Sequence, residues 1–157
     1  MILHKIILSR ELRTTALAKE YLDSTVLPNL VDHHASKAWE DICREHVLRA
    51  VEGISGVGRW WGVVRTSARS TEMREVDVVG VGGGRNVVVA GMCKWTTSLV
   101  DFNELNLLDR LIPHFCDDHV RPLRYLFSRT GFTERLSAHA AADETIRLVT
   151  PDLIYVP

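Results

Sequence analysis

The chain has 157 residues, of which 46% are hydrophobic and 25% are charged, and this balance fits one globular domain with a buried core. The formal net charge of -1 excludes a strongly basic or strongly acidic protein, although a near-neutral total still permits a local basic face. Three widely spaced cysteines, Cys43, Cys93 and Cys116, match no disulfide or zinc-ribbon pattern and favour a reducing compartment, so we expect a cytoplasmic protein.

The first thirty residues predict a helical arm. The opening MILHKIILSR carries an apolar run that is too short and too interrupted for a signal sequence, and no later stretch reaches the roughly 18 to 20 apolar residues of a membrane-spanning helix. Leucines and alanines then recur at helical spacing in LRTTALAKEYLDSTVLPNL, up to an expected break at Pro28 and Asn29. We therefore predict a helical N-terminal arm or linker over residues 1–30, a domain over residues 31–157, and no membrane partner.

A helix and three strands are expected next. SKAWEDICREHVLRAV, residues 36–51, has apolar residues at helical spacing behind Ser36, a candidate N-cap, and a run of glycines begins after it at Gly53. Three β-rich runs follow, GRWWGVVR, REVDVVGV and NVVVAGMCKW, and the last two are joined through a glycine-rich turn. The remaining chain predicts a helix in DFNELNLLDRLIPHFCDDH, a strand in PLRYLFSR, a helix in FTERLSAHAAA and a strand in TIRLVT.

The order of these elements predicts the fold class. Three consecutive strands favour an antiparallel meander, whereas a strand-helix-strand unit favours a parallel crossover. We therefore predict an α/β domain in which a mixed β-sheet is flanked by helices.

The hairpin TEMREVDVVGVGGGRNVVVAGMCKW carries an acid in its first strand and a lysine in its second. Side chains alternate along a strand, so Met92 and Lys94 share one face, and a turn in the glycine run would place Asp77 opposite Met92. Asp77, position 92 and Lys94 are therefore expected to converge. A carboxylate pair that holds Mg²⁺ beside a lysine that assists water is a workable site for phosphodiester hydrolysis, and Glu40 on the preceding helix could supply a further acid.

Five pieces of sequence follow one another between about residues 26 and 149: SKAWEDICREHV, VGRWWG, REVDVV, GMCKW and LFSRTGFTERL. In this order they resemble the PD-(D/E)XK nuclease superfamily, and more narrowly the C-terminal domain of unknown function attached to certain prokaryotic AAA-type ATPases. The resemblance implies a restriction-endonuclease-like fold and a Mg²⁺-dependent endonuclease, a hydrolase acting on DNA phosphodiester bonds. It also makes DNA and an AAA-type ATPase module candidate partners.

The resemblance assigns a role to each of three residues, and it shows that a fourth position lacks the acid that the family usually has there. By position, Asp77 corresponds to the metal-binding acid, Lys94 to the catalytic lysine, and Glu40 to the helix acid that some members use as a further metal ligand. GMCKW stands where that family usually has Gly-Glu-Cys-Lys-Trp, so Met92 replaces the second acid. A thioether is a soft, weak ligand that does not replace a carboxylate on Mg²⁺. Unless Glu40 or Glu75 compensates, hydrolysis is expected to be absent or weakened.

The same residues also have structural interpretations. Asp77 and Lys94 could form a cross-strand ion pair, Glu40 could be an ordinary exposed helix residue, and Met92 could fill the core. Three functions therefore remain open: a divergent nuclease, a degenerate nuclease-like domain associated with DNA, and a non-catalytic structural or partner-docking domain of an AAA-type ATPase. Met92 favours the latter two.

The sequence also bears on how the domain is used. It has no G-x-x-x-x-G-K-S/T element, so the ATPase motor itself is not in this chain, which is expected to be a separated fragment or a stand-alone version. An exposed arm and a tryptophan-rich strand are compatible with a homodimer. The sequence shows no obvious basic patch, so strong affinity for nucleic acid is not indicated. Salt-dependent DNA binding would separate a degenerate nuclease-like domain from a docking domain.

Overall fold

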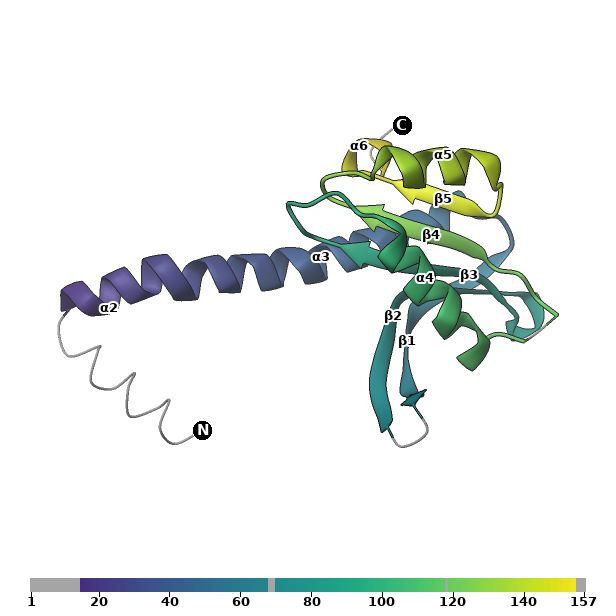
Figure 1. Ribbon diagram of the computed structural model, residues 1–157, viewed down its shortest axis with the longest axis horizontal. Helices are drawn as coiled ribbons and strands as arrows, with labels where there is room; N and C mark the ends of the chain where they lie inside the picture. The colour runs from purple at the N-terminus through teal and green to yellow at the C-terminus, as the bar shows by residue number, and fades with distance from the viewer. Residues whose placement is uncertain (1–14, 68–69, 118, 155–157) are drawn as a thin grey trace. The chain divides into compact units, whose positions relative to one another are not determined.

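The computed structural model describes residues 15–67, 70–117 and 119–154 (Figure 1). The chain divides into two compact units, Met1–Lys37 and Ala38–Pro157. The beginning of the predicted arm, before residue 15, lies outside the described residues. Among the helices that are described, none has the length and apolar character needed to cross a membrane.

Helices fill the described part of the arm. Helix α2 (Thr15–Tyr21), a π-helical segment η1 (Leu22–Val26) and helix α3 (Leu27–Ala50) follow one another directly. The break expected at Pro28 and Asn29 is therefore wrong. Pro28 is the second residue of α3 and follows the π-helical segment directly. A proline has no N–H to donate, and it lies here where the helical hydrogen-bond pattern already changes from π to α.

The part of α3 from Ala38 onward belongs to the second unit. The helix predicted over residues 36–51 is confirmed, but Ser36 lies inside α3 and not at its N-cap, because the helix already begins at Leu27. The helix buries three side chains that are spaced four residues apart, Trp39, Cys43 and Val47. After α3 ends, Gly53 adopts a φ of 76°, which glycine accepts without strain and which turns the chain into the first strand.

In the part of the chain that the structure describes, five strands form one mixed sheet in the order β1-β2-β3-β4-β5. Their bounds are β1 (Ile54–Ser67), β2 (Ser70–Gly82), β3 (Val87–Lys94), β4 (Leu123–Ser128) and β5 (Ile146–Val149). The first three strands pair antiparallel, and β4 and β5 are added in parallel through two helical crossovers, α4 (Phe102–Leu111) and α5 (Glu134–Ala142). The predicted α/β class and the predicted order of elements are confirmed.

The hairpin of β1 and β2 is longer than the sequence predicts. The two strands have 14 and 13 residues, compared with eight in β3, so the hairpin extends beyond the rest of the sheet (Figure 1). Its added residues are mostly polar and exposed, and they therefore leave no alternating apolar signal. The glycine-rich turn between β2 and β3 is confirmed, since the 3-10 segment η2 (Gly83–Arg85) joins them with a φ of 74° at Gly84.

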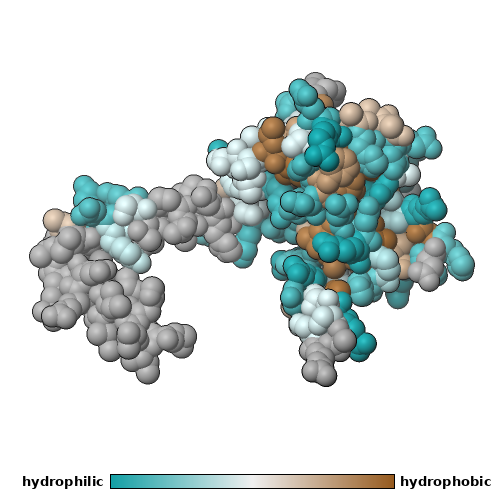
Figure 2. Space-filling view, in the orientation of Figure 1, coloured by the Kyte–Doolittle hydropathy of each residue, from teal (hydrophilic) through white to brown (hydrophobic). Residues whose placement is uncertain are grey.

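The core is divided between the two faces of the sheet. One cluster joins the sheet to α4 and α5 through buried leucines, Leu105, Leu108, Leu111 and Leu136. The other joins it to α3 and to the short helix α6 (Pro151–Ile154). Two layers of helix thus enclose the sheet (Figure 1), and hydrophilic and hydrophobic residues are interspersed on the face of this unit shown in Figure 2.

Candidate functional site

A β-bulge in β2 sets the position of Asp77. The pairing of β1 with β2 shifts between Gly58 and Trp60, where β2 contains an extra residue. The shift changes the alternation of side chains: Val76 packs in the cluster on the α4 face, whereas Val78, two residues later, packs in the cluster on the α3 face. Asp77 lies between them, at the point where the strand changes the direction of its side chains.

The carboxylate of Asp77 acts as a hydrogen-bond acceptor for the neighbouring strand. The ladder between β2 and β3 has its last pair at Val78 and Gly91. Beyond it, the backbone N–H of Cys93 donates to Oδ2 of Asp77 at 2.7 Å. From α3, Nη1 of Arg44 donates to the carbonyl oxygen of Asp77, also at 2.7 Å. Asp77 therefore connects two strands and the helix that covers them.

The pKa of Asp77 is raised to about 6, chiefly because the carboxyl group is buried. The hydrogen bond from Cys93 and the charge of Lys94 act in the opposite direction, whereas the charges of Glu40 and Glu75 raise this pKa further. The fold thus places the other two predicted site residues, Glu40 and Lys94, close enough to Asp77 to influence its carboxyl group. A buried carboxyl group that titrates near neutral pH is a feature common at functional sites.

Lys94 forms its ion pair with a residue that the sequence patterns do not indicate. Its Nζ atom lies 3.1 Å from Oε2 of Glu104, in the first turn of α4. Both side chains are sheltered, with 33% of Lys94 and 22% of Glu104 exposed. The pair therefore joins the end of β3 to the helix that follows it. In the sequence, Glu104 belongs to a predicted helix, but nothing local shows that it faces Lys94.

Met92 is a core residue. Only 6% of its surface is exposed, and it packs in the same cluster as Leu105 and Leu108 of α4. The interpretation of Met92 as core filler is confirmed. The bulge in β2, which an uninterrupted hairpin would lack, directs the carboxylate of Asp77 to the backbone of Cys93 while Met92 packs against apolar side chains.

Glu40 is held by its own helix. Its Oε2 atom lies 3.7 Å from Nη2 of Arg44, one turn later on α3, and Arg44 also binds Asp41 at 2.7 Å. Burial alone would lower the pKa of Arg44, but the hydrogen bond and charge of Asp41, together with the charge of Glu40, raise it overall. The sequence does contain the signal for this cation, since Arg44 follows Glu40 at the helical i, i+4 spacing.

The oxygen atoms at this place do not fit a Mg²⁺ ion. Magnesium requires a nearly octahedral shell of oxygen ligands, usually with one or two carboxylates that are free to bind it. One oxygen of Asp77 already accepts a hydrogen bond, and the other acids are paired, Glu40 with Arg44 and Glu104 with Lys94. Within residues 15–67, 70–117 and 119–154, no three His, Cys, Asp or Glu side chains are placed to hold a metal ion.

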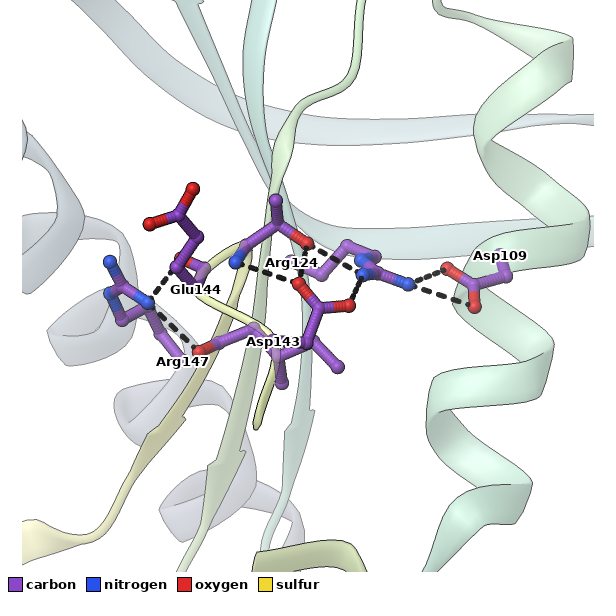
Figure 3. Close-up of polar contacts among 7 residues, drawn as sticks. Asp109, Arg124, Asp143, Glu144 and Arg147 are labelled. Carbon is purple, nitrogen blue, oxygen red and sulfur yellow. Dashed lines mark hydrogen bonds and ion pairs between the residues drawn. The ribbon is translucent and has the colours of Figure 1, made fainter. Parts of the chain in front are cut away.

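A second polar cluster surrounds Arg124 at the opposite end of the parallel strands (Figure 3). Arg124 donates to both carboxylate oxygens of Asp109 at 3.2 Å, and to Asp143 and Thr145 at 2.6 Å each. The pKa of Asp143 is lowered to about 2 by hydrogen bonds from Thr145 and by the charge of Arg124. The cluster borders a pocket of about 360 Å³, but two carboxylates already neutralise Arg124. Arg124 therefore joins α4 and β4 to the turn that precedes β5.

These features define the class of the protein: an α/β domain with a bulged antiparallel hairpin, a buried carboxylate in the bulge and a sheltered lysine on the next strand. The chain belongs to DUF234, a family described as archaeal and bacterial proteins of unknown function, whose model matches residues 6–106. The matched segment includes Glu40, Asp77, Lys94 and Glu104. No curated protein and no solved structure matches the chain.

Proposed function

We propose that this domain is a degenerate PD-(D/E)XK nuclease-like domain with a restriction-endonuclease-like fold, which associates with DNA and whose metal-dependent hydrolysis is absent or weakened. One observation carries the proposal: of the positions that would form the hydrolytic site, Asp77 keeps a buried carboxylate, Met92 is in the core, and Lys94 is paired with Glu104. In this proposal Asp77 and Lys94 are what remains of the hydrolytic site, and the carboxylate pair that would hold the metal is missing.

The charges around Asp77 explain why hydrolysis should be weak. A lysine that assists water or offsets developing charge must be free to approach the phosphate. Lys94 instead lies within an ion pair to α4, and moving it away would leave Glu104 without that pair in a partly buried position. Glu40 would likewise have to leave Arg44 before it could act as a metal ligand.

DNA cleavage tests the proposal. Native protein and the Asp77→Asn, Lys94→Met and Glu104→Gln variants are incubated with supercoiled plasmid and with single-stranded DNA in the presence of Mg²⁺ or Mn²⁺. We expect no more cleavage by the native protein than by Asp77→Asn, which keeps a hydrogen-bond acceptor for Cys93 but loses the charge. Cleavage by the native protein that disappears in both Asp77→Asn and Lys94→Met would show a working nuclease and overturn the proposal.

A second function is favoured by a different observation. On the β1–β2 hairpin, the large apolar side chains of Trp61, Val63 and Met73 are more than half exposed, at 62%, 63% and 66%. Val63 and Met73 pair directly across β1 and β2, so the three side chains lie on one face of the hairpin. Adjacent exposed apolar residues often mark interaction surfaces. The alternative is therefore a non-catalytic docking domain whose hairpin binds an AAA-type ATPase module.

Sedimentation velocity separates this docking role from self-association through the same face. If the hairpin binds a different protein, the native chain alone should sediment as a monomer. The substitutions Trp61→Ser and Met73→Ser should then leave its sedimentation coefficient unchanged. If the native chain is a homodimer that these substitutions dissociate, the face joins two copies and the ATPase assignment loses its support.

A further inference from the structure

A groove between the β1–β2 hairpin and α4 concentrates positive charge. It encloses about 330 Å³ and is lined by residues of both elements and of the 3-10 turn η3 (Ile112–His114) that follows α4. Its polar lining contains three arginines and one histidine, Arg65, Arg74, Arg110 and His114. Its apolar lining consists of Val64, Leu107 and Leu111, and no carboxylate is among the residues that line it.

The arginines of this groove are available to an anion. Arg74 is paired with Glu72, but both side chains are nearly half exposed, and such an exposed pair exchanges for another anion at little cost. The Nε atom of Arg110 donates to the carbonyl oxygen of Asn106 at 3.2 Å, and this bond does not use the terminal Nη groups. The groove thus differs from the pocket beside Arg124, where two aspartates already neutralise the arginine.

We propose that this groove binds the sugar-phosphate backbone of nucleic acid. Guanidinium groups present paired N–H donors that match the oxygens of a phosphate, and arginines from two facing elements suit successive phosphates better than a single one. The apolar side chains at the groove give the sugars a surface to contact. Because the arginines cluster in this groove, the chain has a local basic surface even though its net charge is -1.

The inference rests on the proposed function only in taking DNA as the partner, and it requires no cleavage. It also separates the binding surface from the acid-rich surroundings of Asp77, where neighbouring carboxylates would repel a phosphate. The groove, and not the degenerate site, would then hold the nucleic acid.

Fluorescence anisotropy with a short labelled DNA duplex, and with the corresponding single strand, tests the groove. The full chain is compared with a double variant, Arg74→Gln with Arg110→Gln, and with Arg59→Gln as the matched control. Arg59 lies on the same hairpin and is also paired with an acid, Glu75 at 3.3 Å, but it does not line the groove. Circular dichroism melting establishes that the three proteins are equally folded.

We expect the double variant to bind roughly tenfold more weakly than the native chain, and its plot of log affinity against log salt to be shallower by about 2, one for each lost phosphate contact. The control should keep the native affinity and slope. Unchanged binding by the double variant would overturn the groove while leaving DNA association in place. Absence of binding by the native chain would overturn both proposals.

Competition separates a nucleic-acid backbone from a single bound anion. Unlabelled DNA should displace the labelled duplex at a far lower phosphate concentration than inorganic phosphate does. Displacement by inorganic phosphate at an equal phosphate concentration would mean that the groove takes one anion, and the backbone assignment would be overturned.

Discussion

The Oδ2 atom of Asp77 lies 2.7 Å from the backbone nitrogen of Cys93, where the regular ladder between their strands has ended. The side chain of Asp77 accepts the hydrogen bond that a backbone carbonyl oxygen accepts elsewhere in a β-ladder. The arrangement is costly, because burial and two nearby acids raise the pKa of the carboxyl group to about 6. The protein thus retains a charge that destabilises its folded state at neutral pH.

Asp77→Asn should therefore stabilise the protein. The substitution removes the charge but keeps an oxygen that accepts the hydrogen bond from Cys93, so we expect the free energy of unfolding at neutral pH to increase by roughly 1 to 3 kcal/mol. Urea denaturation measures the change. Asp77→Ala is the control, because it leaves the N–H of Cys93 without its acceptor and should gain less or lose stability. An asparagine variant less stable than the native protein would contradict this account.

Because of the raised pKa of Asp77, we expect the stabilisation by Asp77→Asn to depend on pH. The pKa of Asp77 is 3.8 as an ordinary side chain and about 6 in the folded protein, so between about pH 4 and 6 the folded state holds a proton that the unfolded state has lost. The destabilisation by Asp77 is complete above about pH 6 and is relieved as the pH falls toward 4. The stability difference between Asp77→Asn and the native protein should shrink over this range. A difference that stays constant would assign the effect to something other than this titration.

Met92→Glu should destabilise the fold. The new carboxylate would enter the apolar cluster that Met92 shares with Leu105 and Leu108, so we expect a loss of about 3 kcal/mol or more at neutral pH. Met92→Leu, which keeps an apolar side chain of similar volume, should cost less than about 1.5 kcal/mol. Thermal unfolding distinguishes the two variants. If both variants unfold at the same temperature, position 92 accepts a carboxylate without loss of stability, and the account of Met92 as a core residue would be contradicted.

Lys94 and Glu104 should depend on each other. A double-mutant cycle with Lys94→Met and Glu104→Gln should give a coupling free energy of about 0.5 to 1.5 kcal/mol, since the pair is only partly exposed to solvent. Urea denaturation of the native protein, the two single variants and the double variant supplies the cycle. Additive effects of the two substitutions would show that the 3.1 Å contact contributes nothing to stability.

Arg124 should be more important for stability than its neighbour Arg147 (Figure 3). Arg124→Met deprives Asp109 and Asp143 of their shared donor, so we expect it to lower the free energy of unfolding more than Arg147→Met does. Arg147→Met is the comparison. In both of these hydrogen bonds Arg147 donates to a backbone carbonyl oxygen, of Glu144 and of Ile146, and not to a carboxylate. Equal losses of unfolding free energy would show that the carboxylate contacts are not what stabilises the cluster.

The sequence predicts most of the fold because its signals are local. The spacing of Trp39, Cys43 and Val47 reveals the buried face of α3, and the glycine run reveals the turn after β2. The order of strands and helices then restricts the sheet to a mixed arrangement. The continuation of helix through Pro28 escapes prediction because a proline usually interrupts a helix, and no sequence pattern indicates the π-helical segment that precedes it here.

The candidate site is less predictable because it depends on one extra residue. If side chains alternated along an unbroken hairpin, Asp77 would lie opposite position 92. No residue type or spacing in the sequence of β2 indicates where the bulge forms. The partner of Lys94 is hidden for a different reason. Glu104 reaches it only because the crossover packs α4 on that face of the sheet, a relationship that arises in three dimensions and not along the chain.

The position of β1 in the sheet has a consequence for handling the protein. Among the described residues, β1 has a neighbouring strand on one side only. A strand of 14 residues with an open side is a template on which other chains can add strands and aggregate. Two devices counter this: charged side chains at Arg59 and Arg65, and repeated irregularities in the pairing of β1 with β2 that disturb a flat edge. Removing both arginines together should shorten the time for which a concentrated solution stays clear.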